Sequence, residues 1–188
     1  MTPTDPATLI LMYFVLPVWL AAGFADWLCH RASHIESTSG VKESLIHLLM
    51  FAEVGAPLLA ALFLDVNALI LAVMIVAFFV HEATAMWDVT YAVSRREVTP
   101  IEQHVHSFLE MIPLLAIVTM ATLHWGQFLA LFGLGDEPAR LALAWKQQPL
   151  SGAYVATILG LIVVFEFLPY AEEFLRTRRA GAPLHSER

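Results

Sequence analysis

The stretch TPIEQHVHSFLEMIPLLAIVTMATLHWGQFLALF, residues 99–132, decides the fold class of this chain. Its ionisable residues Glu102, His106 and Glu110 step by four near the beginning, and a long apolar run follows. Because about 20 apolar residues suffice to cross a bilayer, the run predicts a transmembrane helix over residues 104–132. Ionisable side chains next to lipid are costly unless they pair, line a cavity or bind metal, so this helix end indicates a functional site.

Four other segments have the same apolar character, over residues 7–30, 45–64, 67–91 and 152–175. Hydrophobic residues occupy 59% of the 188 positions and charged residues 14%, and the mean hydropathy is +0.69, far above an average soluble domain. We therefore expect an all-α integral membrane bundle of about five transmembrane helices, with one domain over residues 1–180 and a polar tail over residues 181–188. The first run lacks the basic start of a secretory signal peptide, so we expect it to be retained.

The distribution of basic residues predicts the orientation of the bundle. Lysine and arginine gather in the first loop, the third loop and the C-terminal segment, at Arg31, Lys42, Arg95, Arg96, Arg176, Arg178 and Arg179. The N-terminal segment and the second loop contain none, and only the fourth loop departs from the pattern, with Arg140 and Lys146. We expect a protein of a bacterial-type inner (plasma) membrane, with its N-terminus outside and its C-terminus and polar helix ends at the cytoplasmic face.

The polar helix ends carry a carboxylate and an imidazole on each of four predicted helices. Residues four apart differ by about 40° around a helix and residues seven apart by about 20°, so each pair lies on one face. Four such agreements are difficult to explain by surface ion pairs, because the basic residues are too few. They predict a metal site supplied by four helices, with the candidate ligands Asp26, His30, His34, Glu43, His47, His81, Asp88, Glu102, His104, His106 and Glu110.

Other ionisable residues fit this pattern less well. His104 lies about 200° from Glu102 on an ideal helix, so it joins the site only if that helix begins later. His124 belongs to the opposite end of the fourth span and His185 to the tail, and we expect neither to bind metal. Residues that could support the ligands through hydrogen bonds are Glu36, Glu53, Glu82 and Glu166.

The donor types limit the choice of metal. Imidazole and carboxylate without thiolate suit non-haem iron, with manganese or zinc as alternatives. Cys29 is the only cysteine, which excludes an intramolecular disulfide and a cysteine-based zinc site. The candidate ligands outnumber those of one ion, so we expect two ions, or three. Soluble di-iron bundles use Glu-x-x-His motifs, and zinc proteases need a histidine where Ala85 follows His81, so neither template applies.

The run His30-Arg31-Ala32-Ser33-His34, followed by His47, resembles the first histidine box of membrane fatty acid hydroxylases and desaturases. His104-Val105-His106 is similar to a later box of that family, and the likeness extends over residues 26–110. The resemblance implies two irons near the cytoplasmic ends of transmembrane helices, which use oxygen to oxidise lipid or hydrocarbon chains. The paired-histidine boxes of the family are absent here, and carboxylates take the place of some imidazoles.

These patterns predict a membrane-embedded di-iron oxidoreductase that acts on a lipid-like substrate from the bilayer. No flavin, nicotinamide or haem motif is visible, so electrons would come from a separate donor, and no nucleic-acid partner is expected. One alternative is a non-enzymatic membrane protein that binds, senses or transports metal. Another is a zinc hydrolase acting on a lipid amide or ester with a metal-bound water.

Overall fold

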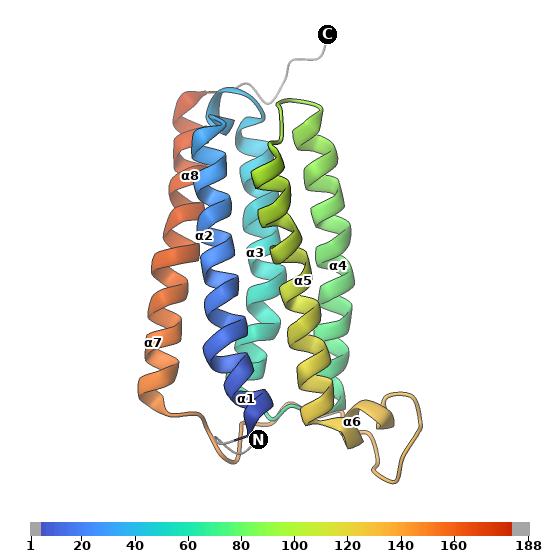
Figure 1. The fold of residues 1–188 in the computed structure, drawn as a ribbon. Coiled ribbons are helices and arrows are strands. Elements are labelled where there is room, and N and C mark those ends of the chain that lie inside the picture. The colour runs from blue at the N-terminus through green and yellow to red at the C-terminus, as the bar shows by residue number, and fades with distance from the viewer. Residues whose placement is uncertain (1–4, 182–188) are drawn as a thin grey trace.

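The structure of the protein is a computed structural model that describes residues 5–181. Five helices, long and apolar enough to cross a membrane, run side by side (Figure 1) and occupy Pro6–Ala32, Gly40–Phe63, Ala68–Val93, Pro100–Leu123 and Gly152–Ala180. The predicted all-helical bundle is confirmed. Over residues 5–181 the only β pairing is an isolated bridge between Leu64 and Trp145.

The first and last spans each contain a short π-helical turn. The first consists of α1 (Pro6–Ile10), the turn Leu11–Val15 and α2 (Leu16–Ala32). The last consists of α7 (Gly152–Ile162), the turn Val163–Phe167 and α8 (Leu168–Ala180). Between them lie α3 (Gly40–Phe63), α4 (Ala68–Val93), α5 (Pro100–Leu123) and the short α6 (Trp125–Ala130).

Local chemistry fixes the ends of α4 and α5. The side chain of Asn67 accepts hydrogen bonds from the backbone N–H groups of Leu69 and Ile70, and Thr99 caps α5 ahead of Pro100. The single helix predicted over residues 104–132 is interrupted, because the chain leaves helical geometry at His124 (φ −122°, ψ 43°), between α5 and α6. The 24 residues of α5 still reach about 36 Å, enough for a hydrocarbon core of about 30 Å.

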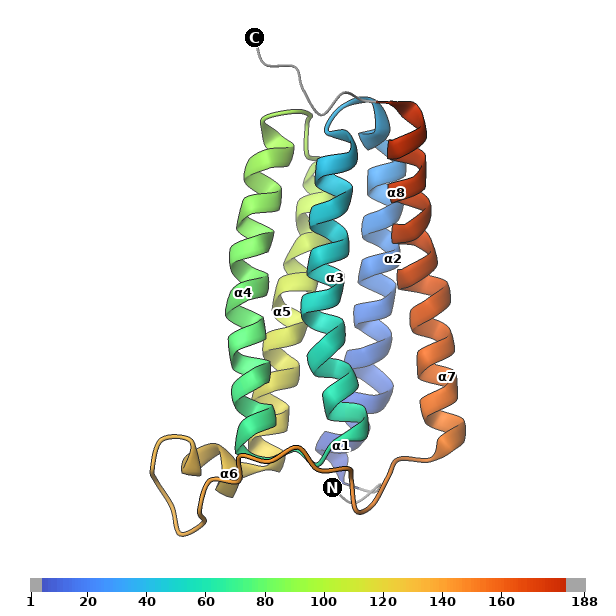
Figure 2. The same ribbon diagram turned by 180° about the vertical axis from the view of Figure 1, so that it is seen from behind.

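The helices form a closed ring in the order α2, α5, α4, α3, α8. The last span therefore packs between the first and the second, as both views show (Figures 1 and 2). α7 diverges from α3 toward the end of the bundle at which the first span begins (Figure 2). Because the ring is closed, side chains from all five spans can meet in its interior.

The interior of the ring is apolar in one half of the bundle and polar in the other. Two buried clusters fill the apolar half, one around Trp19 and Ile112 and the other around Leu71 and Met120. α6 and the segment over residues 131–151 cover the apolar end (Figure 1). This cover is tied to the loop after α3, where Ala142 accepts a hydrogen bond from the Asn67 side chain at 2.8 Å.

Candidate metal centre

The polar half of the ring holds a cluster of buried histidines and carboxylates. It is built from the last turns of α2 and α4, the first turns of α3 and α5, and the middle of α8. The members are at most 9% exposed and comprise Asp26, His30, Glu43, His47, Asp88, Glu102, His106 and Glu173. Helical steps of four place Asp26 beside His30, Glu43 beside His47 and Glu102 beside His106.

One carboxylate holds two imidazoles in the same orientation. Glu173 Oε2 lies 2.9 Å from Nδ1 of His30 and Oε1 lies 2.8 Å from Nδ1 of His47. An ionised carboxylate only accepts hydrogen bonds, so both Nδ1 atoms carry the proton. The Nε2 atoms of both rings are therefore left with free lone pairs, and metal-binding histidines are commonly fixed in this way.

The two Nε2 atoms face carboxylates across the interior. His30 Nε2 lies 3.4 Å from Asp26 Oδ2 and 3.7 Å from Glu102 Oε1. His47 Nε2 lies 3.3 Å from Asp88 Oδ1 and 3.9 Å from Glu43 Oε1. These separations are too long for good hydrogen bonds, but they suit donor atoms that point at a common ion.

Arg96 closes the loop end of the cluster, although it comes from the loop between α4 and α5. Its Nη2 lies 2.5 Å from Oε1 of Glu43 and 2.5 Å from Oε1 of Glu102. Burial alone would lower the pKa of the guanidinium, but the hydrogen bonds and charges of Glu102 and Glu43 outweigh it and hold that pKa above its ordinary value. Arg96 thus joins the carboxylates of α3 and α5.

With its histidines neutral, as metal ligands must be, the cluster has charges that do not balance without further cations. Its five carboxylates carry five negative charges, against the single positive charge of Arg96. Uncompensated charge in a dry interior is costly, and two divalent ions would neutralise the remainder. The atoms without hydrogen bonds give the same indication: within residues 5–181, no hydrogen bond reaches His30 Nε2, His47 Nε2 or Asp88 Oδ1, whereas Asp26 Oδ1 lies 2.9 Å from His106 Nε2.

Two groups of three residues could each hold a metal ion. In each group one donor atom per residue lies within 4.8 Å of the others. The first group is Asp26, His30 and His106, and the second is His30, Glu43 and His47. Because His30 belongs to both, the two positions are adjacent. The donor set therefore fits a compact site rich in carboxylate and imidazole.

Four sequence-predicted ligands lie outside these groups and their immediate contacts. His34 follows the end of α2, adopts a left-handed conformation (φ 52°) and is exposed beside Glu36. His104 points outward and packs on Phe108. His81 is buried deeper in the bundle, with Nδ1 3.7 Å from Glu53 Oε2. Glu110 is half-buried and lines the cavity next to the cluster.

The remaining residues discussed in the sequence analysis also lie partly beside the cluster and partly away from it. Glu166 is buried beside the cluster, whereas Glu36 pairs with Arg176 at the surface of the loop end. Glu53 accepts a hydrogen bond from Thr84 at 2.9 Å. His124 lies at the far end of the bundle, where burial, with nearby positive charge, lowers its pKa to about 4. Glu82 is half-buried on α4, and His185 lies outside the described residues.

The last span supplies Glu173 and Tyr170, which sequence reasoning missed, next to Glu166, which it had placed among the supporting residues. Glu173 orients two histidines, and the Tyr170 hydroxyl donates to Asp26 Oδ2 at 3.4 Å. Glu166 lies against Gly23, where an added Cβ would overlap the Glu166 carboxylate. These three residues step by four and then by three, which places them on one helix face. That spacing is the sequence signal that could have identified them. A carboxylate within an apolar run is as costly to place in a membrane on this span as on the other four.

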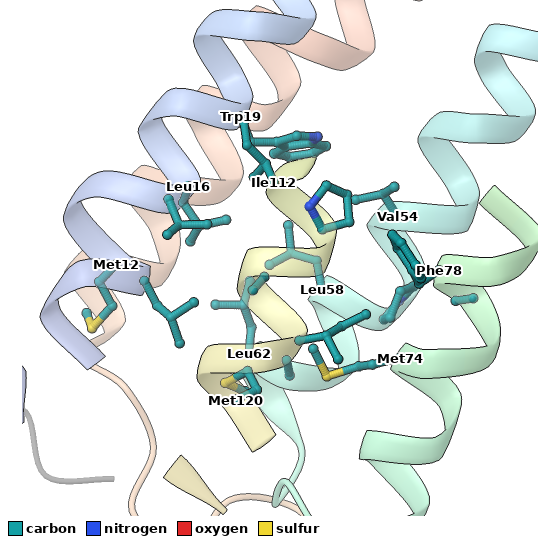
Figure 3. Close-up of a pocket in the computed structure, with 18 of the residues that line it drawn as sticks. Met12, Leu16, Trp19, Val54, Leu58, Leu62, Met74, Phe78, Ile112 and Met120 are labelled. Carbon is teal, nitrogen blue, oxygen red and sulfur yellow. The ribbon is translucent and has the colours of Figure 1, made fainter. Parts of the chain in front are cut away.

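A small cavity of about 60 Å³ adjoins the cluster and is lined by Asp26, His47, Asp88, His106 and Tyr170 among others. A larger cavity of about 140 Å³ continues into the apolar half of the bundle. Trp19, Val54 and His81 line both cavities. Apolar side chains from four spans surround the larger one (Figure 3). The candidate metal centre is therefore at one end of an apolar chamber.

Comparison of the chain with family models, curated proteins and solved structures finds no match. The function is therefore inferred from the donor set, the charge of the cluster and the adjoining chamber.

Proposed function

We propose that this protein is a membrane-embedded oxidoreductase with two adjacent non-haem metal ions, iron in preference to manganese or zinc, and that it acts on a lipid-like hydrophobic substrate. The observation that carries the proposal is the pair of donor groups that share His30 at the end of an apolar chamber. This placement would bring an apolar molecule next to the ions without exposing either to water. Such ions supply the redox chemistry with dioxygen, as the resemblance to the histidine-box family implies.

The residues of the chain would supply geometry and electrostatics. Asp26, His30 and His106 would hold one ion, and Glu43 and His47 the other, because the free Nε2 of His30 can bind only one ion at a time. Asp88 and Glu102 lie close enough to the histidines to complete these shells. Arg96 and Glu173 would bind no metal, since one is a cation and the other is engaged by two imidazole N–H groups. The Arg96–Glu43 and Arg96–Glu102 pairs would moderate the negative charge when the ions leave.

The residues that line the chamber and surround the cluster bear on the two alternative functions, a metal transporter and a zinc hydrolase. A metal transporter needs polar residues along a path across the bilayer, but the chamber beyond His81 is lined mainly by carbon. A zinc hydrolase remains the second candidate, and the identity of the metal separates it from the first. Seven of the ten basic residues lie at the end of the bundle that holds the cluster, which supports placing that end in the cytoplasm, where a soluble electron donor could dock.

Elemental analysis of protein purified in mild detergent tests the metal proposal. We expect two iron ions per chain in the unmodified protein. His30→Ala should remove at least one ion, because its Nε2 lies within reach of both donor groups, whereas His34→Ala, four positions along the chain and exposed, should keep both. A content of one ion or none, or equal loss in the two variants, would contradict a shared two-ion site.

Oxidation chemistry needs a separate measurement. The iron-loaded protein, given a chemical reductant and lipid extract in nanodiscs, should consume oxygen and yield oxidised lipid detectable by mass spectrometry. Two zinc ions with release of a lipid acid or alcohol would instead establish the hydrolase. Two bound ions with neither product would leave a structural or sensing role and refute the enzyme.

A further inference from the structure

Three hollows form a continuous series from the surface of the bundle to the candidate metal centre. A surface groove runs between the end of α3 and α7, and it shares Leu62, Lys146 and Leu150 with the apolar chamber. The chamber in turn shares Trp19, Val54 and His81 with the cavity beside the cluster. The series begins at the end of the bundle opposite the metal centre, where α7 diverges from α3 (Figure 2).

The chamber has a cationic end and an anionic end. Its middle is lined by Leu58, Met74, Phe78, Ile112 and Met120, whose side chains converge on the space in Figure 3. Lys146 lines the end toward the groove, and the carboxylate cluster lies beyond the other end. A molecule that spans the chamber with its negative charge at Lys146 would place that charge beside the cation and far from the carboxylate cluster.

The ammonium group of Lys146 has no partner that would prevent this role. Its backbone N–H donates to the carbonyl of Phe63 at 3.0 Å, which fixes the residue at the mouth of the chamber. Within residues 5–181 the side chain makes no hydrogen bond or ion pair. Asp65, the acid whose charge acts on Lys146, is already paired with Arg140 at 2.9 Å. A half-buried cation without a hydrogen-bonding anion favours the binding of one.

We propose that the substrate is a single-chain amphiphile with an anionic head, that it enters between α3 and α7 and binds Lys146 through its head, and that it extends its chain so that the terminal carbons reach the cavity beside the metal centre. This inference rests on the proposed function for the chemistry at the chain end. The orientation of the bound amphiphile is inferred from the cavities and from Lys146 alone. The head thus remains at the membrane face opposite the metals.

The dimensions of the chamber set the length of the chain. On the first span its lining extends over eleven positions, from Thr8 to Trp19, which corresponds to about 16 Å along a helix. An extended hydrocarbon advances about 1.3 Å per carbon, so the chamber accommodates about a dozen carbons. Dodecanoate is therefore a suitable probe, and longer chains would leave their heads in the groove.

Binding of dodecanoate to the purified protein, measured by calorimetry below its micellar range, tests the site. Lys146→Gln should weaken binding roughly tenfold, whereas Lys146→Arg, which keeps the positive charge at the same position, should change it little. Ala77→Phe should block the chamber, and Val76→Phe, the adjacent lipid-facing position, should not. Equal effects within either matched pair would overturn the proposal.

The orientation is tested with dodecanoate that carries a photoreactive diazirine at its terminal carbon. Cross-links should map to the region of Trp19, Val54 and His81, and cross-links near Leu150 or Tyr154 would mean the reverse orientation and refute the proposal. Metal content is measured on the same samples. Cross-links at Trp19, Val54 and His81 without bound metal would refute the proposed function and support the binding site. Two bound ions without specific cross-links would support the metal centre and refute the binding site.

Discussion

The imidazole rings of His30 and His47 lie stacked, with centroids 4.2 Å apart and planes within 9° of parallel. The two rings come from different helices, and both Nδ1 atoms meet the carboxylate of Glu173. Because one carboxylate accepts a hydrogen bond from each ring, the two rings stay parallel and their Nε2 atoms project into the cluster together. A single residue of the last span thereby sets the geometry of two proposed metal ligands.

Replacing Glu173 with Gln should weaken metal binding by about 10- to 100-fold, because the amide cannot accept from both Nδ1–H groups and carries no charge. The matched control is Glu172→Gln. Glu172 is adjacent but exposed, and it pairs with Arg31 and Arg176. Competition with a chelator of known affinity measures the difference. Similar affinities for the two variants would show that Glu173 does not orient the ligands.

Replacing Arg96 with Gln should destabilise the metal-free protein, because Glu43 and Glu102 would lose their buried cation, and breaking such a pair costs about 3–5 kcal/mol. Arg95→Gln should have little effect, since Arg95 is exposed and rests on the ring of Tyr91. Thermal melting with and without a chelator measures this. The interval between metal-loaded and metal-free Tm should widen in Arg96→Gln only; an unchanged interval would argue against bound cations beside these acids.

His81→Ala should retain both metal ions and lose binding of the apolar probe, because His81 lies between the two cavities and outside both donor groups. The spacing of seven between His81 and Asp88 places them on one face but about 10 Å apart along α4. His47→Ala, in contrast, should lose metal. Elemental analysis of the two variants decides whether the ion site extends as deep as His81.

Gly23→Ala should reduce stability and metal content, because the new methyl group would displace the carboxylate of Glu166 from its place beside Asp26. Gly55→Ala serves as the control, since nothing lies within 4 Å of an added Cβ there. A glycine in an exposed helix interior costs about 0.5–1 kcal/mol relative to alanine, so the control should be neutral or slightly stabilising. Opposite shifts in Tm are therefore expected from the same chemical change.

The affinity for dodecanoate should fall as the pH rises through the pKa of Lys146. Burial lowers that pKa below its ordinary value, and the charge of Asp65 only partly opposes this. The anion binds the protonated form of Lys146, so binding is present at neutral pH. Binding is lost as the pH rises, and the loss occurs at a lower pH than is usual for lysine. Lys146→Arg should keep its affinity over the same interval because arginine stays charged. His124 and Arg140 also face this region, and the arginine variant separates their contribution.

The sequence was sufficient for the bundle and for much of the cluster, because both depend on local helical periodicity. Steps of four place Asp26 with His30, Glu43 with His47 and Glu102 with His106 in any straight helix. The same rule failed at His34, since α2 ends at Ala32 and the chain turns left-handed there. His104 was also among the predicted ligands, on the condition that its helix began later, and α5 begins as early as Pro100.

The parts that depend on tertiary packing could not be read from the sequence. Nothing in the order of the spans indicates that the fifth helix lies between the first and the second, and only this arrangement brings Glu173 to His30 and His47. Arg96 could equally have been a loop cation at the surface. Its burial follows from the approach of α3 and α5, which lets one guanidinium pair with acids of two helices.

The place of α8 in the ring has a consequence for biosynthesis. Chains are made from the N-terminus, so four spans exist before the last one is released. Until α8 closes the gap between α2 and α3, the two stacked imidazoles lack the carboxylate that sets their protonation. We therefore expect loading of the centre to wait for the end of translation. A chain truncated before residue 173 would remain an open, metal-free bundle, and such an exposed seam is what membrane quality-control proteases can recognise.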